Sequence, residues 1–190
     1  MTKKLSLFYP VKPWRVNQPF GNVLPMYINL GLKGHNGIDA YAVDAQSVRA
    51  AHDGVVTFTG EDGKAGLGVA LRTNDQFDYL GEQAYYKTIY WHIKPNSFKV
   101  KPGQQVKTGD IVALADNTGM STGTHLHFGL KPVYKGEQDW QLVNAEQNNG
   151  YFGSIDPQPY FTNIFAEDVV KYKGLLTSLV GLLEKLVELL

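Results

Sequence analysis

Two histidines separated by a single residue, His125 and His127, lie in a stretch of sequence with the composition of a β-strand. In a strand, residues i and i+2 project from the same face about 7 Å apart. Both imidazoles would therefore face one small volume, while Leu126 and Phe128 would face the opposite side and enter a core. Imidazole nitrogens bind transition metals and transfer protons near neutral pH, so the pair predicts a site for one or both reactions.

A third histidine and a carboxylate lie far upstream, at His35 and Asp39. In an extended strand these two residues would be about 13 Å apart, too far to share a metal ion. Two glycines and a β-branched isoleucine in Gly34–Asp39 argue against a helix. The dipeptide Asn36-Gly37 is a strong signal for a tight turn, which would bring His35 and Asp39 together.

One imidazole of the downstream pair, together with His35 and Asp39, supplies three nitrogen and oxygen ligands. Catalytic zinc sites have this number of protein ligands and keep a fourth position for water, whereas structural zinc sites are closed and rich in cysteine. The sequence contains no cysteine. We therefore expect one zinc ion in a catalytic rather than a structural site.

The two histidine motifs occur in a fixed order with several hairpin-like segments around them. The segments are His35-x-x-x-Asp39, Val48–Val55, Ile89–Ile93, Gly103–Ile111, Ser121–Phe128 and Ile155–Pro157. Across roughly residues 17 to 160, this set resembles the lysostaphin-type, LytM-like zinc metalloendopeptidases that act on bacterial peptidoglycan. The resemblance implies an antiparallel β domain with one zinc ion.

The resemblance also implies a role for each residue of the site. It assigns His35, Asp39 and His127 to the metal, and His125 to catalysis. His92, which matches the family's Tyr-x-His segment, would be the second catalytic imidazole. The sequence has no His-Glu-x-x-His motif, so no glutamate of that motif is available as a base and the histidines must handle the protons.

His52 matches no motif of the family, and we expect it to be solvated or structural.

The function implied is hydrolysis of peptide bonds in the cross-bridges or stem peptides of peptidoglycan. Such an enzyme acts at the cell wall, in an extracellular, periplasmic or virion-associated setting. The first ten residues have too short an apolar stretch for a signal peptide, so we expect none in this chain. Two other functions stay open: a non-catalytic peptidoglycan-binding or regulatory module, and a structural module of a virion.

Composition excludes several classes of protein. The chain has 190 residues with 18 basic and 18 acidic side chains, so no net field would attract nucleic acid. The lack of cysteine excludes a disulfide framework and a thiolate nucleophile.

Short apolar runs separated by turn dipeptides predict the fold. They cover residues 48–51, 55–58, 68–71, 88–93, 111–115 and 125–130. We expect an all-β domain over residues 1–165, an antiparallel sheet or open β-sandwich with long surrounding loops. In the loop-like segment 131–160, Trp140 and Tyr151 are either substrate contacts or packing residues.

The last segment, 166–190, has a helical period in place of the strand pattern. Leucines at 176, 179, 183, 186 and 190 alternate at spacings of three and four, as in a coiled-coil seam. Further apolar residues make this apolar stripe wider than a coiled coil of two helices needs. We expect an amphipathic helix that packs on its own domain or associates with itself or a partner through residues 175–190. The stretch is too short and too charged for a transmembrane span.

Overall fold

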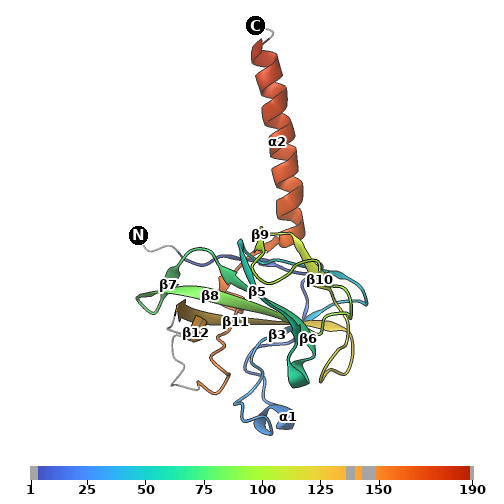
Figure 1. Cartoon of the computed structure of the whole chain (residues 1–190), viewed down its shortest axis with the longest axis vertical. Coiled ribbons are helices and arrows are strands. Elements are labelled where there is room, and N and C mark those ends of the chain that lie inside the picture. The colour runs from blue at the N-terminus through green and yellow to red at the C-terminus, as the bar shows by residue number, and fades with distance from the viewer. Residues whose placement is uncertain (1–3, 136–139, 143–148, 189–190) are drawn as a thin grey trace.

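The structure is a computed structural model that describes residues 4–135, 140–142 and 149–188, with only the backbone described at 140–142 and 186–188. Its largest element is one antiparallel sheet (Figure 1). In spatial order its strands are β2 (Val16–Gln18), β3 (Ile38–Tyr41), β11 (His125–Lys135), β8 (Glu82–Trp91), β6 (Leu67–Thr73), β5 (Gly54–Glu61) and β9 (Gln105–Val106). β12 (Trp140–Leu142) pairs with β11, and β7 (Phe77–Tyr79) pairs with β8.

Two small sheets complete the β structure. β4 (Ser47–Arg49) pairs antiparallel with β10 (Ile111–Leu114). β1 (Leu7–Tyr9) pairs with β13 (Phe161–Phe165), and this pairing is parallel. A single buried cluster joins these strands to the large sheet through residues such as Leu7, Val48, Tyr90, Val112 and Phe128. The predicted antiparallel β fold is therefore confirmed, with one parallel pair that the sequence pattern did not indicate.

The two faces of the large sheet differ. Leu126, Phe128 and Leu130 of β11 are fully buried in the core, whereas His125 and His127 lie on the opposite face and are partly exposed. The predicted alternation along this strand is therefore correct. The short helix α1 (Pro25–Ile28) lies on the opposite side of the sheet from the C-terminal helix α2 (Figure 1), and short 3-10 helices occur at Gly63–Ala65 and Gln158–Tyr160.

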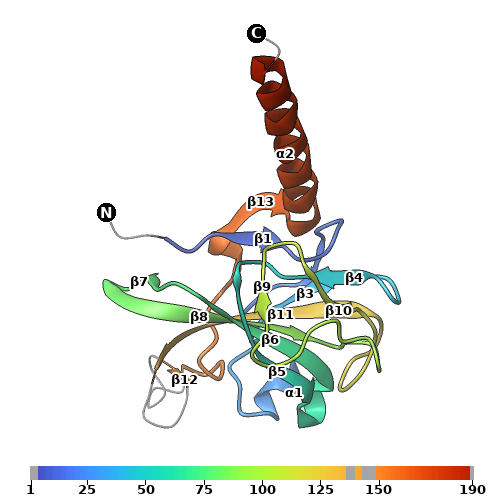
Figure 2. The same cartoon turned by 45° about the horizontal axis from the view of Figure 1, so that its top comes forward.

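The C-terminal helix, α2 (Ala166–Glu188), projects away from the β structure as an isolated rod (Figure 2). Its first turn is fixed by Gly109, which lies against the Ala166 carbonyl and Val170, and by an ion pair of 2.9 Å between Lys12 and Asp168. Every residue from 171 to 180 is exposed. Packing of this helix on its own domain, one of the two arrangements expected, therefore does not occur in the structure. Among the described helices, none combines the length and apolarity needed to cross a membrane.

Candidate metal and active site

The metal cluster is built on the pairing of β3 with β11. His127 and Asp39 are direct partners in this antiparallel pair, so their side chains emerge side by side on the same face. His127 Nδ1 lies 3.0 Å from Asp39 Oδ1. The sheet register therefore brings together a carboxylate and an imidazole from segments far apart in the chain.

His35 completes the cluster from the loop before β3. Its Nε2 lies 3.1 Å from Asp39 Oδ1 and 2.9 Å from His127 Nδ1. The backbone of His35 accepts a hydrogen bond from the Gly21 N–H and donates one to the Asn22 carbonyl. This pair of bonds fixes the loop, and the side chain is 2% exposed, so the imidazole is held in place by its surroundings.

These three side chains suit a metal ion. Their ligand atoms all lie within 4.8 Å of one another, and the contacts given above are 2.9–3.1 Å. Donors at tetrahedral positions 2.0–2.1 Å from zinc are roughly 3.3 Å apart, so these three contacts need to lengthen only by a few tenths of an ångström to fit the ion. Two imidazoles and a carboxylate without thiolates are the donor set of a catalytic zinc site.

Two more imidazoles lie beside this cluster. His125 Nε2 is 3.5 Å from Asp39 Oδ1, and the ring centroid of His92 is 4.5 Å from that of His125 and 6.1 Å from that of His127. His92 follows the end of β8 with a φ of 65°, a left-handed conformation that is uncommon for a residue other than glycine. This strained position at the end of a strand turns the ring toward the site.

Backbone carbonyls fix the tautomers of three of these histidines. The Nδ1 atoms of His35, His92 and His125 lie 3.1, 2.7 and 2.7 Å from the carbonyl oxygens of residues 19, 118 and 123, respectively. A carbonyl oxygen can only accept, so each Nδ1 carries the proton and each Nε2 is left free for a metal or a proton. Sequence reasoning missed these partners, because a carbonyl belongs to every residue and leaves no signal in side-chain types.

Burial and mutual contact set the electrostatics of the cluster. Burial opposes ionisation of Asp39, but contact with the imidazoles of His125, His127 and His35 holds the pKa of its carboxyl well below the usual range. Burial lowers the pKa of His92 to about 4, and the neighbouring imidazoles of His125 and His127 act in the same direction. Burial also lowers the pKa of His127. For His125, burial acts downward but the Asp39 carboxylate beside it raises the pKa overall.

An aromatic side chain borders the cluster on the same face of the sheet. Trp91 is the direct partner of His127 on one side and of Gly68 on the other. A Cβ on Gly68 would lie 1.8 Å from the Trp91 ring, so this glycine is what allows the indole to lie over β6. Phe58 meets the indole edge-on, with ring centroids 5.9 Å apart. Trp91 lies within the segment Ile89–Ile93, but only the strand register shows that its indole borders the metal cluster.

The remaining predicted residues lie elsewhere. His52 is buried and hydrogen-bonded to the Asp53 carbonyl at 2.9 Å and the Thr88 hydroxyl at 2.8 Å, which is a structural position. Tyr151 packs against Phe20 with ring centroids 4.7 Å apart, next to the loop that holds His35. The backbone of Trp140 lies in β12, but its side chain is outside the described residues.

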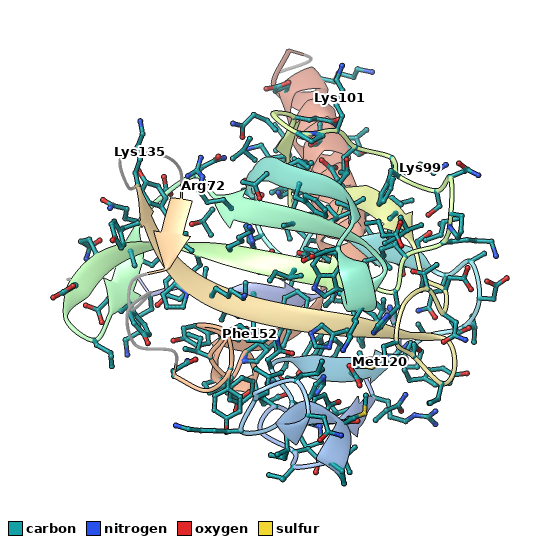
Figure 3. All side chains as sticks on the ribbon, turned by 60° about the horizontal axis from the view of Figure 1, so that its bottom comes forward. Arg72, Lys99, Lys101, Met120, Lys135 and Phe152 are labelled. Carbon is teal, nitrogen blue, oxygen red and sulfur yellow. The ribbon has the colours of Figure 1, made fainter. Side chains whose placement is uncertain are left out.

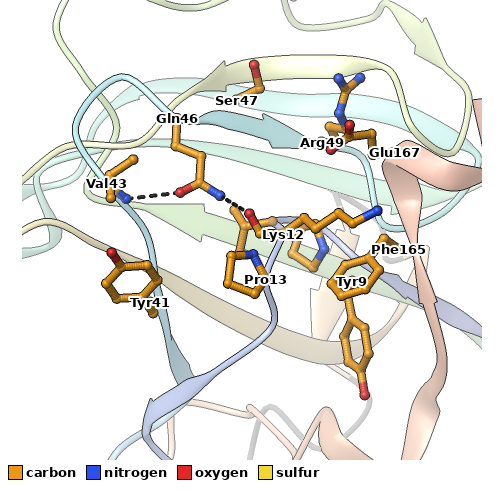
Figure 4. Close-up of a pocket in the computed structure, with 12 residues that line it drawn as sticks. Tyr9, Lys12, Pro13, Tyr41, Val43, Gln46, Ser47, Arg49, Phe165 and Glu167 are labelled. Atoms are coloured by element: carbon orange, nitrogen blue, oxygen red, sulfur yellow. Dashed lines mark hydrogen bonds between the residues drawn. The ribbon is translucent and has the colours of Figure 1, made fainter.

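A pocket of about 490 Å³ lies between the N-terminal segment, β4 and the start of α2 (Figure 4). None of the residues of the metal cluster lines it. Gln46 is one of its lining residues. The Gln46 amide accepts a hydrogen bond from the Val43 N–H and donates one to the Lys12 carbonyl, so it links the β3–β4 loop to the N-terminal segment. The site chemistry is therefore separate from this pocket.

Comparison with known proteins identifies the family. The model of "Peptidase family M23" matches residues 33–145, which is more than half of the chain and includes all four histidines of the site and Asp39. The chain belongs to peptidase family M23. This M23 chain thus carries a His-Asp-His metal site of the type that holds zinc in the family, and the resemblance described from the sequence is confirmed.

Two relatives illustrate the range of the family. The M23 chain is 32% identical over 160 residues to "Peptidoglycan DD-endopeptidase ShyA" of Vibrio cholerae and 31% identical over 133 residues to "Glycyl-glycine endopeptidase ALE-1" of Staphylococcus capitis. The alignments cover 84% and 69% of this chain, but only 33% and 30% of the relatives. The M23 chain thus spans a third or less of the length of either protein.

A solved structure shares the fold. It is a zinc-containing peptidase from Vibrio cholerae, which is 26% identical, has a TM-score of 0.57, and matches 82% of this M23 chain and 39% of its own chain. The fold around the metal cluster is therefore that of a known zinc peptidase.

Proposed function

We propose that this protein is a zinc-dependent endopeptidase that hydrolyses peptide bonds in the cross-bridges or stem peptides of bacterial peptidoglycan. The observation that carries the proposal is the convergence of His35, Asp39 and His127 with two further imidazoles, His92 and His125, on one face of the sheet. Membership of the M23 family and relatives named as a peptidoglycan DD-endopeptidase and a glycyl-glycine endopeptidase support the substrate class. Action at the cell wall follows from this substrate.

His35 and Asp39 would hold the metal together with His127, through Nε2 of His35, Oδ1 of Asp39 and Nδ1 of His127. Zinc bound there supplies Lewis acidity, which polarises a peptide carbonyl and lowers the pKa of a coordinated water. The Pro19 carbonyl, which accepts from His35 Nδ1, keeps the other nitrogen of that ring unprotonated and aimed at the cluster.

His92 and His125 would handle the protons. Each ring keeps its Nδ1 proton on a backbone carbonyl and presents Nε2 toward the space beside the metal ligands. A base at that position can remove a proton from the attacking water, and its conjugate acid can stabilise the developing oxyanion and return a proton to the leaving amine. Two such rings 4.5 Å apart can divide these tasks.

We also propose Tyr151 and Trp140 as substrate contacts. Tyr151 is partly exposed and packs on Phe20, one residue from the Pro19 carbonyl that holds His35. Partly exposed tyrosines beside a site commonly contact ligands.

Zinc analysis together with hydrolysis of purified peptidoglycan tests the proposal. The wild-type chain should contain one zinc ion and release amino groups, and a chelator should abolish release. Asp39→Asn should lose zinc and activity, whereas Asp44→Asn, which alters an exposed carboxylate paired with Lys94 at 2.7 Å, should retain both. His92→Ala and His125→Ala should keep zinc but lose activity by about 10²- to 10⁴-fold. Zinc-loaded protein that binds peptidoglycan without releasing amino groups would favour the non-catalytic module.

We also propose that copies of this chain associate through α2 into a bundle of more than two helices. Leu175 to Gly181 and Leu182 to Glu188 repeat the pattern Leu-Leu-x-x-Leu-Val-x with a period of seven residues. The apolar side chains described in these repeats, at positions 175, 176, 179, 180, 182 and 183, are 45–64% exposed.

A period of seven fits a partner that is itself a helix. With Leu176 and Leu183 at position a, the positions a, d, e and g of each heptad are all apolar. This apolar stripe is wider than the one that a two-helix coiled coil buries. A membrane surface fits less well, because residues 174–188 carry Glu184, Lys185 and Glu188 and have no basic polar face.

Sedimentation of the full chain tests the helix proposal. Wild type at about 100 μM should sediment as an oligomer, and Leu176→Gln with Leu183→Gln should sediment as a monomer with its hydrolytic activity intact. Thr177→Gln with Ser178→Gln, on the polar side of the same turns, should leave the oligomer unchanged. A monomeric wild type, or one that binds vesicles of neutral lipid, would refute self-association.

A further inference from the structure

A row of directly paired residues crosses the large sheet, starting from the metal cluster. In order along the row, the residues are Asp39 on β3, His127 on β11, Trp91 on β8, Gly68 on β6 and Gly60 on β5. Direct cross-strand partners project from the same face of a sheet. Figure 3 shows β11, β8 and β6 side by side, with Met120 near the end of β11 that carries the histidines. The row therefore places Trp91 between a metal ligand and two residues without side chains.

The indole of Trp91 extends away from the metal and lies over β6. A Cβ on Gly68 would be 1.8 Å from Cε3 and 2.0 Å from Cζ3 of the indole. A Cβ on Gly60 would be 3.3 Å from Cζ of Phe58, the ring that meets the indole edge-on. Glycine inside a strand weakens the strand, and often marks a place that a ligand approaches closely. The two glycines thus make room for an aromatic surface beside the metal cluster.

Trp91 is not part of the core that joins the strands. The preceding residue, Tyr90, is fully buried and packs on Phe128 with ring centroids 5.3 Å apart. Trp91 faces the opposite side of the sheet and is partly exposed. Within the part of the chain that the structure describes, the indole N–H has no acceptor, and solvent reaches it. A tryptophan buried for packing usually pairs this N–H, so the indole offers a ligand both an apolar face and a donor.

The indole lies close enough to the metal to contact substrate residues near the scissile bond. The Cβ atoms of direct partners are about 5 Å apart, and neighbouring strands are about 4.8 Å apart. A ring that reaches from β8 over β6 therefore lies about 5 to 10 Å from the Cβ of His127. An extended peptide advances about 3.4 Å per residue, so the indole underlies the first few residues on one side of the metal.

We propose that Trp91 is a subsite for a small apolar side chain of the peptide substrate, the methyl group of an alanine close to the scissile bond. The inference rests on the proposed function, because it takes the substrate to be a peptide that crosses this face. A methyl group seated on the indole removes apolar surface of both partners from water, and the indole N–H donates to a peptide carbonyl beside it. Glycine has no side chain for this surface. The subsite thus favours alanine-containing stem peptides over runs of glycine.

A pair of matched peptides tests the subsite. The probes are a cross-linked stem-peptide dimer released from peptidoglycan and a synthetic copy in which its alanines are replaced by glycine. Wild type should cleave the alanine form at least about four-fold better, the effect of burying one methyl group. Trp91→Ala should lose this preference through KM for the alanine form, with kcat and zinc content unchanged. Phe98→Leu, which alters a half-buried aromatic residue outside the row, should behave as wild type.

Trp91→Phe separates the aromatic face from the N–H. This variant keeps a ring next to Phe58, so it also serves if Trp91→Ala does not fold. It should keep the preference for alanine, while KM for both forms rises about five-fold through loss of one hydrogen bond. An unchanged KM would overturn the role of the N–H, and loss of zinc would show that Trp91 acts on the metal cluster instead.

Binding distinguishes failure of the subsite from failure of the proposed function. Calorimetry on zinc-loaded His125→Ala protein, which should not cut the probes, compares the affinities of the two forms. Equal binding of both forms, together with equal cleavage by wild type, would overturn the subsite and leave the hydrolase standing. Tighter binding of the alanine form without any cleavage by wild type would retain the subsite and reject the hydrolase. A preference for alanine that survives in Trp91→Ala would also overturn the subsite.

Discussion

Gly37 lies against the edge of the His127 imidazole. A Cβ at this position would be 2.6 Å from both Cε1 and Nε2 of that ring and 2.7 Å from the Phe128 carbonyl oxygen. The backbone of Gly37 does not have a positive φ, so the residue is not needed there for a left-handed turn. The glycine is required because the loop carrying His35 passes directly over β11, and contact with this loop helps to orient the His127 ring.

Gly37→Ala is expected to weaken zinc binding by about 10- to 100-fold, because the added methyl group would displace the loop that orients the His127 ring. Loss of a group that orients a metal ligand typically has an effect of this size. Competition with a chromogenic chelator measures the affinity. Gly123→Ala is the matched control, because nothing lies within 4 Å of the Cβ it would add. Unchanged affinity in Gly37→Ala would show that the His127 ring can shift without cost.

Thr118 is predicted to position His92. Its hydroxyl donates to the Ile93 carbonyl at 2.9 Å and accepts from the Leu67 N–H at 3.2 Å, and its own carbonyl accepts from His92 Nδ1. Thr118→Val should lower kcat by about ten-fold with zinc retained. The variant loses the hydroxyl hydrogen bonds, each of about 1 kcal/mol, that hold the Thr118 carbonyl in position against His92. Thr118→Ser keeps the hydroxyl and should restore kcat. A loss through KM alone would contradict the positioning role.

Gly68→Ala should displace the Trp91 indole from β6. Overpacking of this kind costs about 1–3 kcal/mol of unfolding free energy, which urea denaturation measures. Gly129→Ala tests the same change on β11, where the new Cβ would meet its nearest neighbours at 3.6–3.8 Å, an ordinary contact. Equal stability of the two variants would mean that the indole has room to move.

His52 makes stability depend on pH. Burial lowers its pKa to about 4 in the folded chain, whereas an unfolded histidine titrates near 6.5. The unfolded state therefore binds the proton first, and the stabilisation present above pH 6.5 is lost as the pH falls toward 4. At pH 5 this loss is about 2 kcal/mol.

His52→Gln should remove that part of the pH dependence. Denaturant unfolding of the metal-free wild type and variant at pH 7 and pH 5 gives the difference, because the other titrating groups are common to both proteins. Parallel curves for the two proteins would show that His52 keeps its ordinary pKa when folded.

Much of the site could be predicted because its chemistry is carried by side-chain types at short spacings. The two-residue period of a strand was enough to place His125 and His127 on one face and Leu126 and Phe128 in the core, as the structure has them. The expected proximity of His35 and Asp39 is also correct. The chain bends at residues 36 and 37, where the Asn-Gly pair predicts a turn, although neither residue has a positive φ, and Gly37 also serves close packing against His127.

Strand boundaries were less predictable than strand identity. The run at 125–130 is part of a strand that continues to Lys135, and the run at 88–93 overlaps the end of β8, which begins at Glu82 and ends at Trp91. Polar residues such as Lys131 and Lys87 broke the apolar pattern at these places. They face the same side of the sheet as the metal cluster, so an apolar count could not detect that the strands continue.

The sequence by itself determined which residues can bind a metal and transfer protons, and that they sit on a β domain followed by an apolar helix, because these properties depend on residue type and local period. Only the tertiary structure decided that Asp39 pairs with His127, that carbonyls of residues 19, 118 and 123 fix three imidazoles, and that α2 stands clear of the domain. The physical reason is that strand register and backbone hydrogen bonds join residues far apart in the chain, and nothing in the identity of a single residue encodes its partner.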